Sequence, residues 1–374
     1  MTGMDGKLAI DLAAIMRGFD IQGAPGEIIP LKIGHIHDTF RVQNLEPASP
    51  DYLLQRINVS IFKDPAALME NIGFVTRHIR RKLEAIPGSE PAREVLTVVP
   101  SNDGRGYLRM GEEYWRLYRY IDKARSYDMA ETGTRAFEGG RVFGRFLSLV
   151  ADLDPSRLHD TIPRFHDVEN RYSLFQRSLQ ADPLGRASEV RVEIAFVERR
   201  IASMSLLNRL GRQGVLPLRI VHNDAKFNNA LFDESGKALC VVDLDTTMPG
   251  YIAYDFGDAL RTIVGASPED EKDLSKISVN LDLLCEFARG FLAETAAFVS
   301  RAEVDSLAEG VLLMPFIMGL RFLTDYIDGD RYYKIVSPAQ NLQRARAQFR
   351  LTELLEERRD EIRDIVNRWA PPDI

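Results

Sequence analysis

The sequence predicts an α+β fold in two lobes, a small β-rich N-terminal lobe and a larger, mainly helical C-terminal lobe. In the first third of the chain, short segments alternate polar and apolar residues between turns, as strands with one buried face do. After Asp122 the apolar residues recur at helical spacing. A chain of 374 residues is long enough for two lobes. We expect one lobe over residues 1–120 and a second over residues 121–374.

The N-terminal lobe is expected to contain several strands and one long helix. The helix begins at Asp64 and Pro65, because an Asp N-cap followed by proline is a typical helix start. Its apolar face includes Leu68, Ile72 and Val75. The predicted strands cover residues 27–33, 39–42, 51–57, 94–99, 106–110 and 114–120.

The C-terminal lobe is expected to be helical except in its middle. The predicted helices cover residues 137–150, 172–179, 190–210, 281–299, 304–326 and 340–369. Short strands are predicted at residues 218–221, 230–232 and 238–242. An Asp-Glu-Ser-Gly turn separates the last two strands, which indicates a hairpin.

The composition is that of a globular protein with mixed surface charge. Hydrophobic residues make up 45% and charged residues 28%, so sizeable cores can be buried. The 48 basic and 55 acidic residues give a net charge of −7, with both signs interspersed. No basic block stands out, which argues against nucleic acid as a partner.

Targeting and redox signals are sparse. No apolar segment follows a basic N-terminal one, and no run of 18 apolar residues occurs, so we expect neither a signal peptide nor a membrane span. Cys240 and Cys285 lie in apolar runs and provide no disulfide framework. We expect a cytoplasmic protein with reduced thiols, whose oligomeric state the sequence leaves open.

The most informative segment runs from Ile220 to Arg261. Asp224 and Asn229 stand five residues apart in a loop after a predicted strand, and Asp243 follows fourteen residues later at the end of another strand. A single Asp or Asn in a loop is more often a turn former than a ligand. The ordered set of carboxylate, amide and carboxylate is typical of phosphoryl transfer.

Each member of this set has a predicted role. Asp224 is the candidate base that accepts the proton of a substrate hydroxyl. Asn229 and Asp243 offer hard oxygen ligands, which suit Mg²⁺ bound to the phosphates of ATP. His222 and Asp255 are predicted to support the loop structurally.

Asp245 and Lys226 each have more than one possible role. Asp245 is a second metal ligand, a substrate contact or a turn carboxylate, and we assign it to substrate binding. Lys226 either neutralises a phosphate or is a solvated lysine.

The N-terminal lobe is expected to bind the nucleotide. The turn from Gly34 to Thr39 either covers the phosphates or is a plain hairpin. Arg56 is predicted to pair with Glu70 and to contact the phosphates. Backbone groups near Tyr120 would contact adenine, although aromatic residues there also suit a core. The predicted nucleotide-binding residues are Gly34, Thr39, Arg56, Glu70, Tyr120 and Ile121.

These residues resemble the aminoglycoside phosphotransferase superfamily of small-molecule kinases over most of the chain. The resemblance implies a protein-kinase-like fold, ATP, Mg²⁺ and a small-molecule alcohol as acceptor. The sequence is also similar, more narrowly, to the N-acetylhexosamine 1-kinase group, which transfers the γ-phosphate to the anomeric hydroxyl of N-acetylglucosamine or N-acetylgalactosamine. The segments that carry the narrower resemblance are 52–58, 68–72, 222–232, 242–250, 254–261 and 321–330.

The loop departs from the superfamily pattern at Asn223 and at Lys226-Phe227-Asn228. Members usually have glycine in the first place and an aromatic-rich or His-Pro-Gly run in the second. The departure weakens the expectation of an aminoglycoside acceptor.

The acceptor is expected to contact Arg321, Asp325 and Tyr326, which lie on one predicted helix. Arg321 and Asp325 are four residues apart and share a face. On spacing alone they would form a solvated ion pair, but the apolar segment 316–318 indicates a buried helix, where a charged pair needs a reason. The alternatives are another acceptor, such as homoserine, choline, methylthioribose, another sugar or an aminoglycoside, or a nucleotide-binding pseudokinase.

Overall fold

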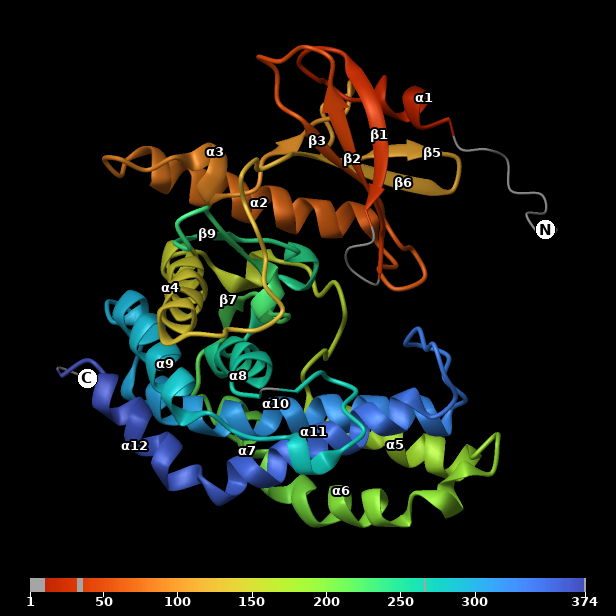
Figure 1. The fold of residues 1–374 in the computed structure, drawn as a ribbon, viewed down its shortest axis with the longest axis vertical. Coiled ribbons are helices and arrows are strands. Elements are labelled where there is room, and N and C mark those ends of the chain that lie inside the picture. Colours follow the sequence, from red (N-terminus) through yellow and green to blue (C-terminus); the bar gives the residue numbers. More distant parts are fainter. Residues whose placement is uncertain (1–10, 32–35, 266, 373–374) are drawn as a thin grey trace. The chain divides into compact units, whose positions relative to one another are not determined.

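The computed structural model describes residues 11–31, 36–265 and 267–372. The chain forms two compact units, Met1–Lys123 and Ala124–Ile374 (Figure 1). The expected lobe boundary near residue 120 lies beside this division. The first unit is built on an antiparallel sheet and the second is mainly helical, which confirms the predicted α+β fold.

The N-terminal unit contains a six-stranded antiparallel sheet in the order β1-β2-β3-β6-β4, with β5 also paired to β6. Its strands are β1 (Pro25–Leu31), β2 (Asp38–Asn44), β3 (Tyr52–Arg56), β4 (Val98–Val99), β5 (Leu108–Met110) and β6 (Glu113–Arg119). Its helices are α1 (Leu12–Met16), α2 (Pro65–Glu84) and α3 (Pro91–Glu94). Five of the six predicted strands overlap observed ones closely, whereas the segment 94–99 divides between α3 and β4.

The two faces of this sheet differ in character, because successive side chains of a strand point to opposite faces. One face packs a hydrophobic cluster that includes Tyr52, Leu54 and Trp115 together with Met16 and Phe19. On the opposite face, Thr39, Gln55 and Arg116 occupy paired positions of β2, β3 and β6. Because of this alternation, residues one position apart on a strand lie on opposite faces of the sheet.

Helix α2 begins where the sequence predicts. The Asp64 side chain accepts a hydrogen bond from the backbone N–H of Ala67, and Pro65 occupies the first helical position. Leu68, Ile72 and Val75 are fully buried along its apolar face.

The C-terminal unit consists of helices around two short two-stranded sheets, β7–β10 and β8–β9. Its helices are α4 (Gly133–Val150), α5 (Val168–Ala181), α6 (Arg191–Met204), α7 (Leu206–Arg212), α8 (Ile252–Ile263), α9 (Leu281–Thr295), α10 (Arg301–Ile327), α11 (Gln340–Glu357) and α12 (Arg359–Trp369). Its strands are β7 (Arg219–Val221), β8 (Ala230–Phe232), β9 (Ala238–Val241) and β10 (Met248–Gly250). The predicted hairpin is β8–β9.

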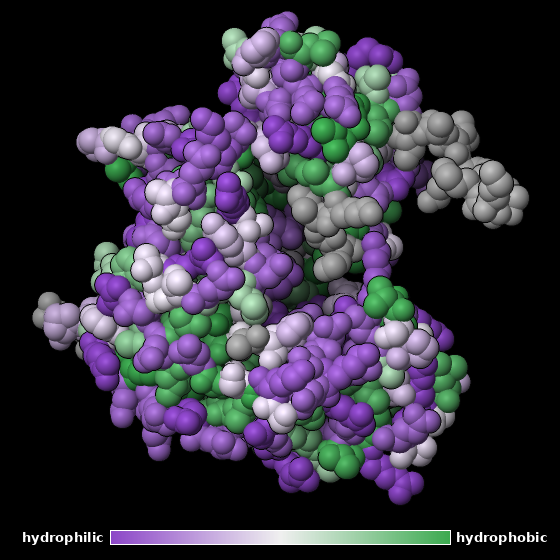
Figure 2. Space-filling view, viewed as in Figure 1, coloured by the Kyte–Doolittle hydropathy of each residue, from purple (hydrophilic) through white to green (hydrophobic). Residues whose placement is uncertain are grey.

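Helix α10 is the central helix of this unit and packs against α8 and α11. Within the described residues it is the one helix long and apolar enough to cross a membrane by length and composition, yet 83% of its most apolar window is buried in the fold. Figure 2 shows hydrophilic and hydrophobic side chains interspersed on the visible face of the unit.

Glycines allow α8 and α10 to approach closely. A Cβ atom at Gly257 would lie 2.1 Å from the carbonyl oxygen of Gly310, and one at Gly310 would lie 2.1 Å from the carbonyl oxygen of Ala253. Backbone therefore meets backbone at this crossing, which fixes α8 in the unit.

Candidate active site

The loop that follows β7 carries the candidate base. Asp224 lies between the end of β7 and the short 3₁₀ turn η3 (Phe227–Asn229), and its side chain is 27% exposed. Asn229 donates its side-chain amide to the Asp224 carbonyl at 2.8 Å and to Asp224 Oδ2 at 3.2 Å. The loop thus closes on itself and presents the carboxylate at its surface.

Helix α8 holds this loop from beneath. The two carboxylate oxygens of Asp255 each accept one backbone N–H, from His222 and from Asn223, both at 2.7 Å. Two turns further along α8, Thr262 Oγ1 accepts the backbone N–H of Phe227 at 3.1 Å. Positions seven apart lie on one helix face, so a single face of α8 supports both ends of the loop.

Asp255 is completely buried. Burial raises the pKa of this carboxyl group to about 6, although the two backbone N–H donors work in the opposite direction. These contacts are the supporting interaction expected of Asp255.

His222 links the loop to the end of β9. Its Nδ1 accepts the backbone N–H of Asp224 at 3.3 Å, and its Nε2 donates to the carbonyl oxygen of Val242 at 2.8 Å. One acceptor and one donor require a neutral imidazole protonated at Nε2. The rings of Phe143 and Phe146 meet His222 edge-on at 6.0 and 5.9 Å. His222 is therefore a buried scaffold residue.

Lys226 controls the charge state of Asp224. Its Nζ lies 3.1 Å from Asp224 Oδ2. Burial of Asp224 favours the protonated acid, but Lys226 and other neighbouring groups outweigh it and lower the pKa of Asp224. The carboxylate is consequently ionised at neutral pH, as a proton acceptor must be.

A backbone hydrogen bond brings the segments of Asn229 and Asp243 together. The backbone N–H of Val242 donates to the Asn229 carbonyl at 2.8 Å, which joins β8 to the end of β9. Asp243 is exposed and adopts a left-handed conformation with φ of 61°. Its charge acts on Lys226, as does the charge of Asp224.

The donor set fits a divalent cation held jointly with phosphates. The amide nitrogen of Asn229 faces Asp224, so its Oδ1 points elsewhere and accepts no hydrogen bond in the part of the chain that the structure describes. Among the described residues no group of three or more His, Cys, Asp or Glu side chains is arranged to hold a metal alone. One amide and one carboxylate are the kind of partial ligand set that Mg²⁺ uses when nucleotide phosphates supply other oxygens.

Two buried charges beneath the loop were not predicted. Asp258 and Arg261 on α8 form an ion pair at 2.9 Å, with side chains only 4% and 2% exposed, and Arg261 also contacts Glu269 at 2.8 Å. Burial raises the pKa of Asp258, and the nearby charge of Asp224 adds to this effect. Both residues belong to the segment 254–261 described above. Their position beneath the loop follows from α8, which the sequence did not predict.

A second group of side chains surrounds Asp224 on the helical unit. Arg321 on α10 is close enough for the Asp224 charge to act on it. His166 Nε2 lies 2.6 Å from the carbonyl oxygen of Asn223, the residue before Asp224. Arg171 and Arg321 both stack on the ring of Phe165, at 5.6 and 4.8 Å from its centroid. Of these residues only Arg321 was predicted, because the others stand more than fifty positions before Asp224 in the chain.

Asp325 does not have the predicted role of contacting substrate. Its two oxygens accept the backbone N–H groups of residues 331–333 at 2.8 to 3.0 Å and the side-chain amide of Asn341 at 2.9 Å. Asp325 is also only 5% exposed. It therefore shapes the loop that presents Tyr332 and Tyr333.

Tyr326 also departs from its predicted role. Its hydroxyl donates to Glu189 Oε2 at 3.2 Å, and the guanidinium of Arg186 stacks on its ring at 4.4 Å. These partners belong to the 3₁₀ turn η2 (Arg186–Glu189). Five positions along a helix turn a side chain well away from Arg321, so the two residues face different neighbours.

The predicted pair of Arg56 with Glu70 is absent. Arg56 pairs instead with Asp38 and, at 2.7 Å, with Glu113. By strand alternation Arg56 shares the face of Tyr52 and Leu54. The predicted Arg56–Glu70 pair was therefore wrong, and a contact between Arg56 and the nucleotide stays a prediction.

The face opposite Arg56 carries a linked row of polar side chains. Arg116 Nε donates to Gln55 at 2.9 Å, and Gln55 donates to Thr39 at 3.1 Å. Arg116 is 1% exposed and Thr39 is 4% exposed. Arg116 therefore lies on the face of Thr39, as Arg41 does by strand alternation, and the sequence did not indicate Arg116.

The remaining predicted nucleotide-binding residues lie at the edges of the N-terminal unit. Gly34 lies outside the described residues. The backbone N–H of Tyr120 donates to the Asp51 carbonyl at 2.8 Å, and Arg41 stacks on its ring at 4.4 Å. Ile121 is buried. A role for Tyr120 and Ile121 in adenine binding stays a prediction.

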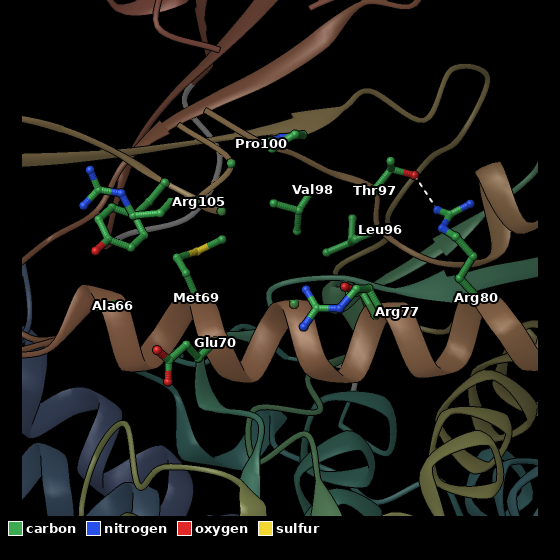
Figure 3. Close-up of a pocket in the computed structure, with 15 residues that line it drawn as sticks. Ala66, Met69, Glu70, Arg77, Arg80, Leu96, Thr97, Val98, Pro100 and Arg105 are labelled. Atoms are coloured by element: carbon green, nitrogen blue, oxygen red, sulfur yellow. Dashed lines mark hydrogen bonds between the residues drawn. The ribbon is translucent and has the colours of Figure 1, made fainter. Parts of the chain in front are cut away.

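Glu70 lines a pocket of about 450 Å³ within the N-terminal unit, between α2 and the region of β4. Figure 3 shows Met69 and Val98 facing each other across it, while Glu70 points away from Val98. Arg77 and Arg80 also line the pocket, and Arg80 donates to Thr97 Oγ1 at 2.5 Å. The catalytic loop contributes no residue to this pocket.

Asp245 lies in the 3₁₀ turn η4 (Leu244–Thr246), two residues after Asp243, and is 3% exposed. Its carbonyl oxygen accepts the Thr161 hydroxyl at 2.8 Å. The next residue, Thr246, donates its hydroxyl to the His222 carbonyl at 2.8 Å. Substrate binding by the Asp245 side chain stays a prediction.

A β-sheet unit followed by a helical unit, with an ionised loop carboxylate beside an amide and a second carboxylate, defines a phosphotransferase of the protein-kinase-like class. The model of the phosphotransferase enzyme family, APH, matches residues 27–276, which is more than half of the chain. The chain therefore belongs to this family.

Solved structures share the fold over nearly the whole chain. An aminoglycoside phosphotransferase from Alicyclobacillus acidocaldarius superposes with a TM-score of 0.59 at 13% identity, covering 98% of this chain and 99% of that one. A choline kinase from Cryptosporidium parvum gives 0.60 at 13%, covering 96% and 98%. An amicoumacin kinase in complex with AMP-PNP, Ca²⁺ and Ami gives a TM-score of 0.56 at 13% identity, covering 96% of this chain and 94% of that one.

Proposed function

We propose that this family member is an ATP-dependent sugar kinase that phosphorylates the anomeric hydroxyl of an N-acetylhexosamine. The observation that carries the reaction type is the Asp224 carboxylate, which Lys226 keeps ionised at the surface of a loop braced by Asp255. A hydroxyl placed against Asp224 would give up its proton as the γ-phosphate is transferred.

Asn229 and Asp243 would hold the magnesium ion. The ion would neutralise charge on the transferring phosphate and help align it with the acceptor hydroxyl. The charges of Asp224 and Asp243 both act on Lys226. Its ammonium group would therefore approach the same phosphate. A related fold binds AMP-PNP with Ca²⁺, which supports a nucleotide and a divalent cation here.

The row of Thr39, Gln55 and Arg116 in the N-terminal unit is the best candidate for contact with the nucleotide. Arg116 supplies a guanidinium, the side chain that matches phosphate geometry best. Arg56 stays a predicted nucleotide contact, and Arg116 is a second candidate cation for the proposed nucleotide site.

A sugar acceptor is supported by the side chains around Asp224. Phe165, Tyr332 and Tyr333 offer aromatic surfaces for a ring face, and Arg171 and Arg321 offer N–H donors for hydroxyl and acetamide oxygens. Choline and aminoglycosides are cations, which two neighbouring guanidinium groups disfavour. The sequence segments described above favour an N-acetylhexosamine within the sugars.

The test is ADP release from Mg-ATP with N-acetylglucosamine, N-acetylgalactosamine, glucose, galactose, homoserine, choline and kanamycin as acceptors. Turnover confined to the N-acetylhexosamines, with a sugar 1-phosphate as product, is expected. Asp224→Asn should reduce kcat by about 10²-fold or more while ATP binding is retained. Activity on another acceptor would support the same mechanism with a different substrate. ATP binding without any turnover would favour a pseudokinase.

A further inference from the structure

Two arginines near Asp224 form no ion pair within the described residues. Arg171 on α5 donates from Nε and Nη2 to the Phe165 carbonyl, at 2.9 and 2.7 Å. Arg321 on α10 makes one long contact, 3.4 Å from Nη1 to the sulfur of Met318. Burial, reinforced by the charge of Arg321, lowers the pKa of Arg171 to about 10. Both residues are only partly exposed, and a guanidinium group in such surroundings normally pairs with an anion.

The nearest carboxylates along the same elements are occupied elsewhere. Asp325, one turn after Arg321, binds the backbone of residues 331–333. Asp167, one turn before Arg171, accepts from the Asn170 backbone and the Asn208 side chain and pairs with Arg164. These acids thus have other partners, and neither guanidinium group has a carboxylate partner among the described residues.

The free nitrogens of the two guanidinium groups reach open space. The buried side-chain atoms that lack a hydrogen bond, among the residues that the structure covers, include none from Arg171 or Arg321. Arg171 Nη1 and the remaining nitrogens of Arg321 are therefore unpaired but accessible to a ligand. The two groups also lie near each other, because the charge of Arg321 adds to burial in lowering the pKa of Arg171 and both guanidinium groups contact the ring of Phe165.

Two further polar atoms beside them, Nδ1 of His166 and the hydroxyl of Tyr333, are buried and have no hydrogen-bond partner in the described part of the chain. His166 is 4% exposed, and its Nε2 donates to Asn223, so Nδ1 carries a free lone pair. Burial lowers the pKa of His166 to about 3, and the neighbouring charges of Arg321 and Arg171 contribute, so the ring stays neutral. The ring centroid of Tyr333 lies 5.6 Å from Cζ of Arg321. Unsatisfied polar atoms of this kind are expected where a ligand completes the site.

We propose that Arg171 and Arg321 bind an anionic substituent of the acceptor, a carboxylate, sulfate or phosphate ester, while the reacting hydroxyl faces Asp224. The inference rests on the proposed function. It narrows the proposed acceptor to an N-acetylhexosamine that carries an acidic group. Guanidinium groups form charge-assisted, often bidentate hydrogen bonds with such oxyanions. His166 Nδ1 and the Tyr333 hydroxyl are placed to bind neighbouring hydroxyl or amide groups of the same acceptor.

The inference is tested first by binding, which does not depend on turnover. Calorimetry with the full chain would compare N-acetylglucosamine, its 6-phosphate, its 6-sulfate and glucuronic acid in the absence of ATP. At least one acidic ligand should bind about 10-fold or more tightly than N-acetylglucosamine. Equal or weaker binding of all three acids would overturn the inference, and the order among them identifies the anion.

Variants then separate anion recognition from a structural role. Arg321→Met and Arg171→Met should each remove the preference for the acidic ligand, whereas Arg321→Lys, which keeps the charge, should recover part of it. Arg301→Met, at the exposed start of the same helix as Arg321, is the control and should keep the preference. A preference that persists in both methionine variants, with folding verified by circular dichroism, would refute the assignment.

Kinetics distinguish this inference from the proposed function. Turnover of neutral N-acetylhexosamines with kcat/KM equal to or above that of the acids would preserve the kinase and reject the acidic acceptor. Tight binding of an acid with no phosphorylation of any ligand would preserve the anion site and reject the kinase.

Discussion

The amide nitrogen of Asn229 is bound to Asp224, at 2.8 Å to its carbonyl and 3.2 Å to its carboxylate. This contact fixes which way the amide faces. Its nitrogen stays with the candidate base, and its oxygen is left for a cation.

Replacement of Asn229 should therefore change the magnesium requirement. In Asn229→Ala the amide oxygen is lost, and the Mg²⁺ concentration for half-maximal activity should rise about 10-fold or more. The adjacent Asn228 is the matched control, because it is exposed and bonds Asp128 instead. Magnesium titrations of activity at fixed ATP would compare Asn229→Ala with Asn228→Ala. Equal Mg²⁺ dependence in the two variants would remove Asn229 from the cation site.

Lys226 should set the acid limb of the pH–rate profile. Burial alone would raise the pKa of Asp224, and Lys226 is the leading group that lowers it. In Lys226→Met the pKa of Asp224 should rise, so the loss of kcat/KM on acidification should begin at higher pH, by about one unit or more. Profiles between pH 4 and 9 would show this shift. The exposed Lys237→Met serves as the control, and a matching shift there would mean that Lys226 has no specific effect.

Asp255 should couple folding to pH. Its pKa of about 6 in the folded protein exceeds the ordinary value of 3.8, so the folded state binds this proton more tightly than the unfolded chain does. The stabilisation from protonation is full below about pH 4 and is lost as the pH rises through about 6. Urea unfolding should show this dependence in the wild type and lose it in Asp255→Asn.

The same variant should be less stable at neutral pH. An asparagine can accept only one of the two backbone N–H groups of His222 and Asn223, and a buried unpaired donor costs about 1–3 kcal/mol. The exposed Asp282→Asn is the control and should leave the free energy of unfolding nearly unchanged. A wild-type free energy of unfolding in Asp255→Asn would contradict the bracing role of Asp255.

The parts of the molecule that the sequence predicts are those with local causes. The start of α2 follows from Asp64 and Pro65 alone, and the hairpin β8–β9 follows from its turn. Helix α8 was not predicted, because its polar residues Asp255, Asp258 and Arg261 are themselves buried, whereas polar residues normally mark the solvent face of a helix. The predicted pairing of Arg56 with Glu70 was wrong because its partners, Asp38 and Glu113, come from other strands of the sheet, and strand pairing has no local signal in the sequence.

The acceptor side of the site depends on long-range packing. His166 and Arg171 reach the loop because α5 packs against α10, and nothing near Asp224 in the sequence indicates them. Asp325 and Tyr326 share a helix with Arg321, yet each has partners that only the tertiary fold provides.

The crossing of α8 and α10 should be intolerant of any side chain at Gly257. A Cβ atom there would lie 2.1 Å from the carbonyl oxygen of Gly310, and backbone cannot move aside as a flexible side chain can. Gly257→Ala should therefore destabilise the protein by about 1–3 kcal/mol or more, as overpacking does. Because α8 also carries Asp255, the variant should lose activity together with stability. Gly133→Ala in α4 is the control, since its Cβ would meet only the Glu286 side chain, at 3.3 Å. Thermal unfolding and activity would be measured for both variants, and a Gly257→Ala protein as stable as Gly133→Ala would show that the two helices can separate without cost.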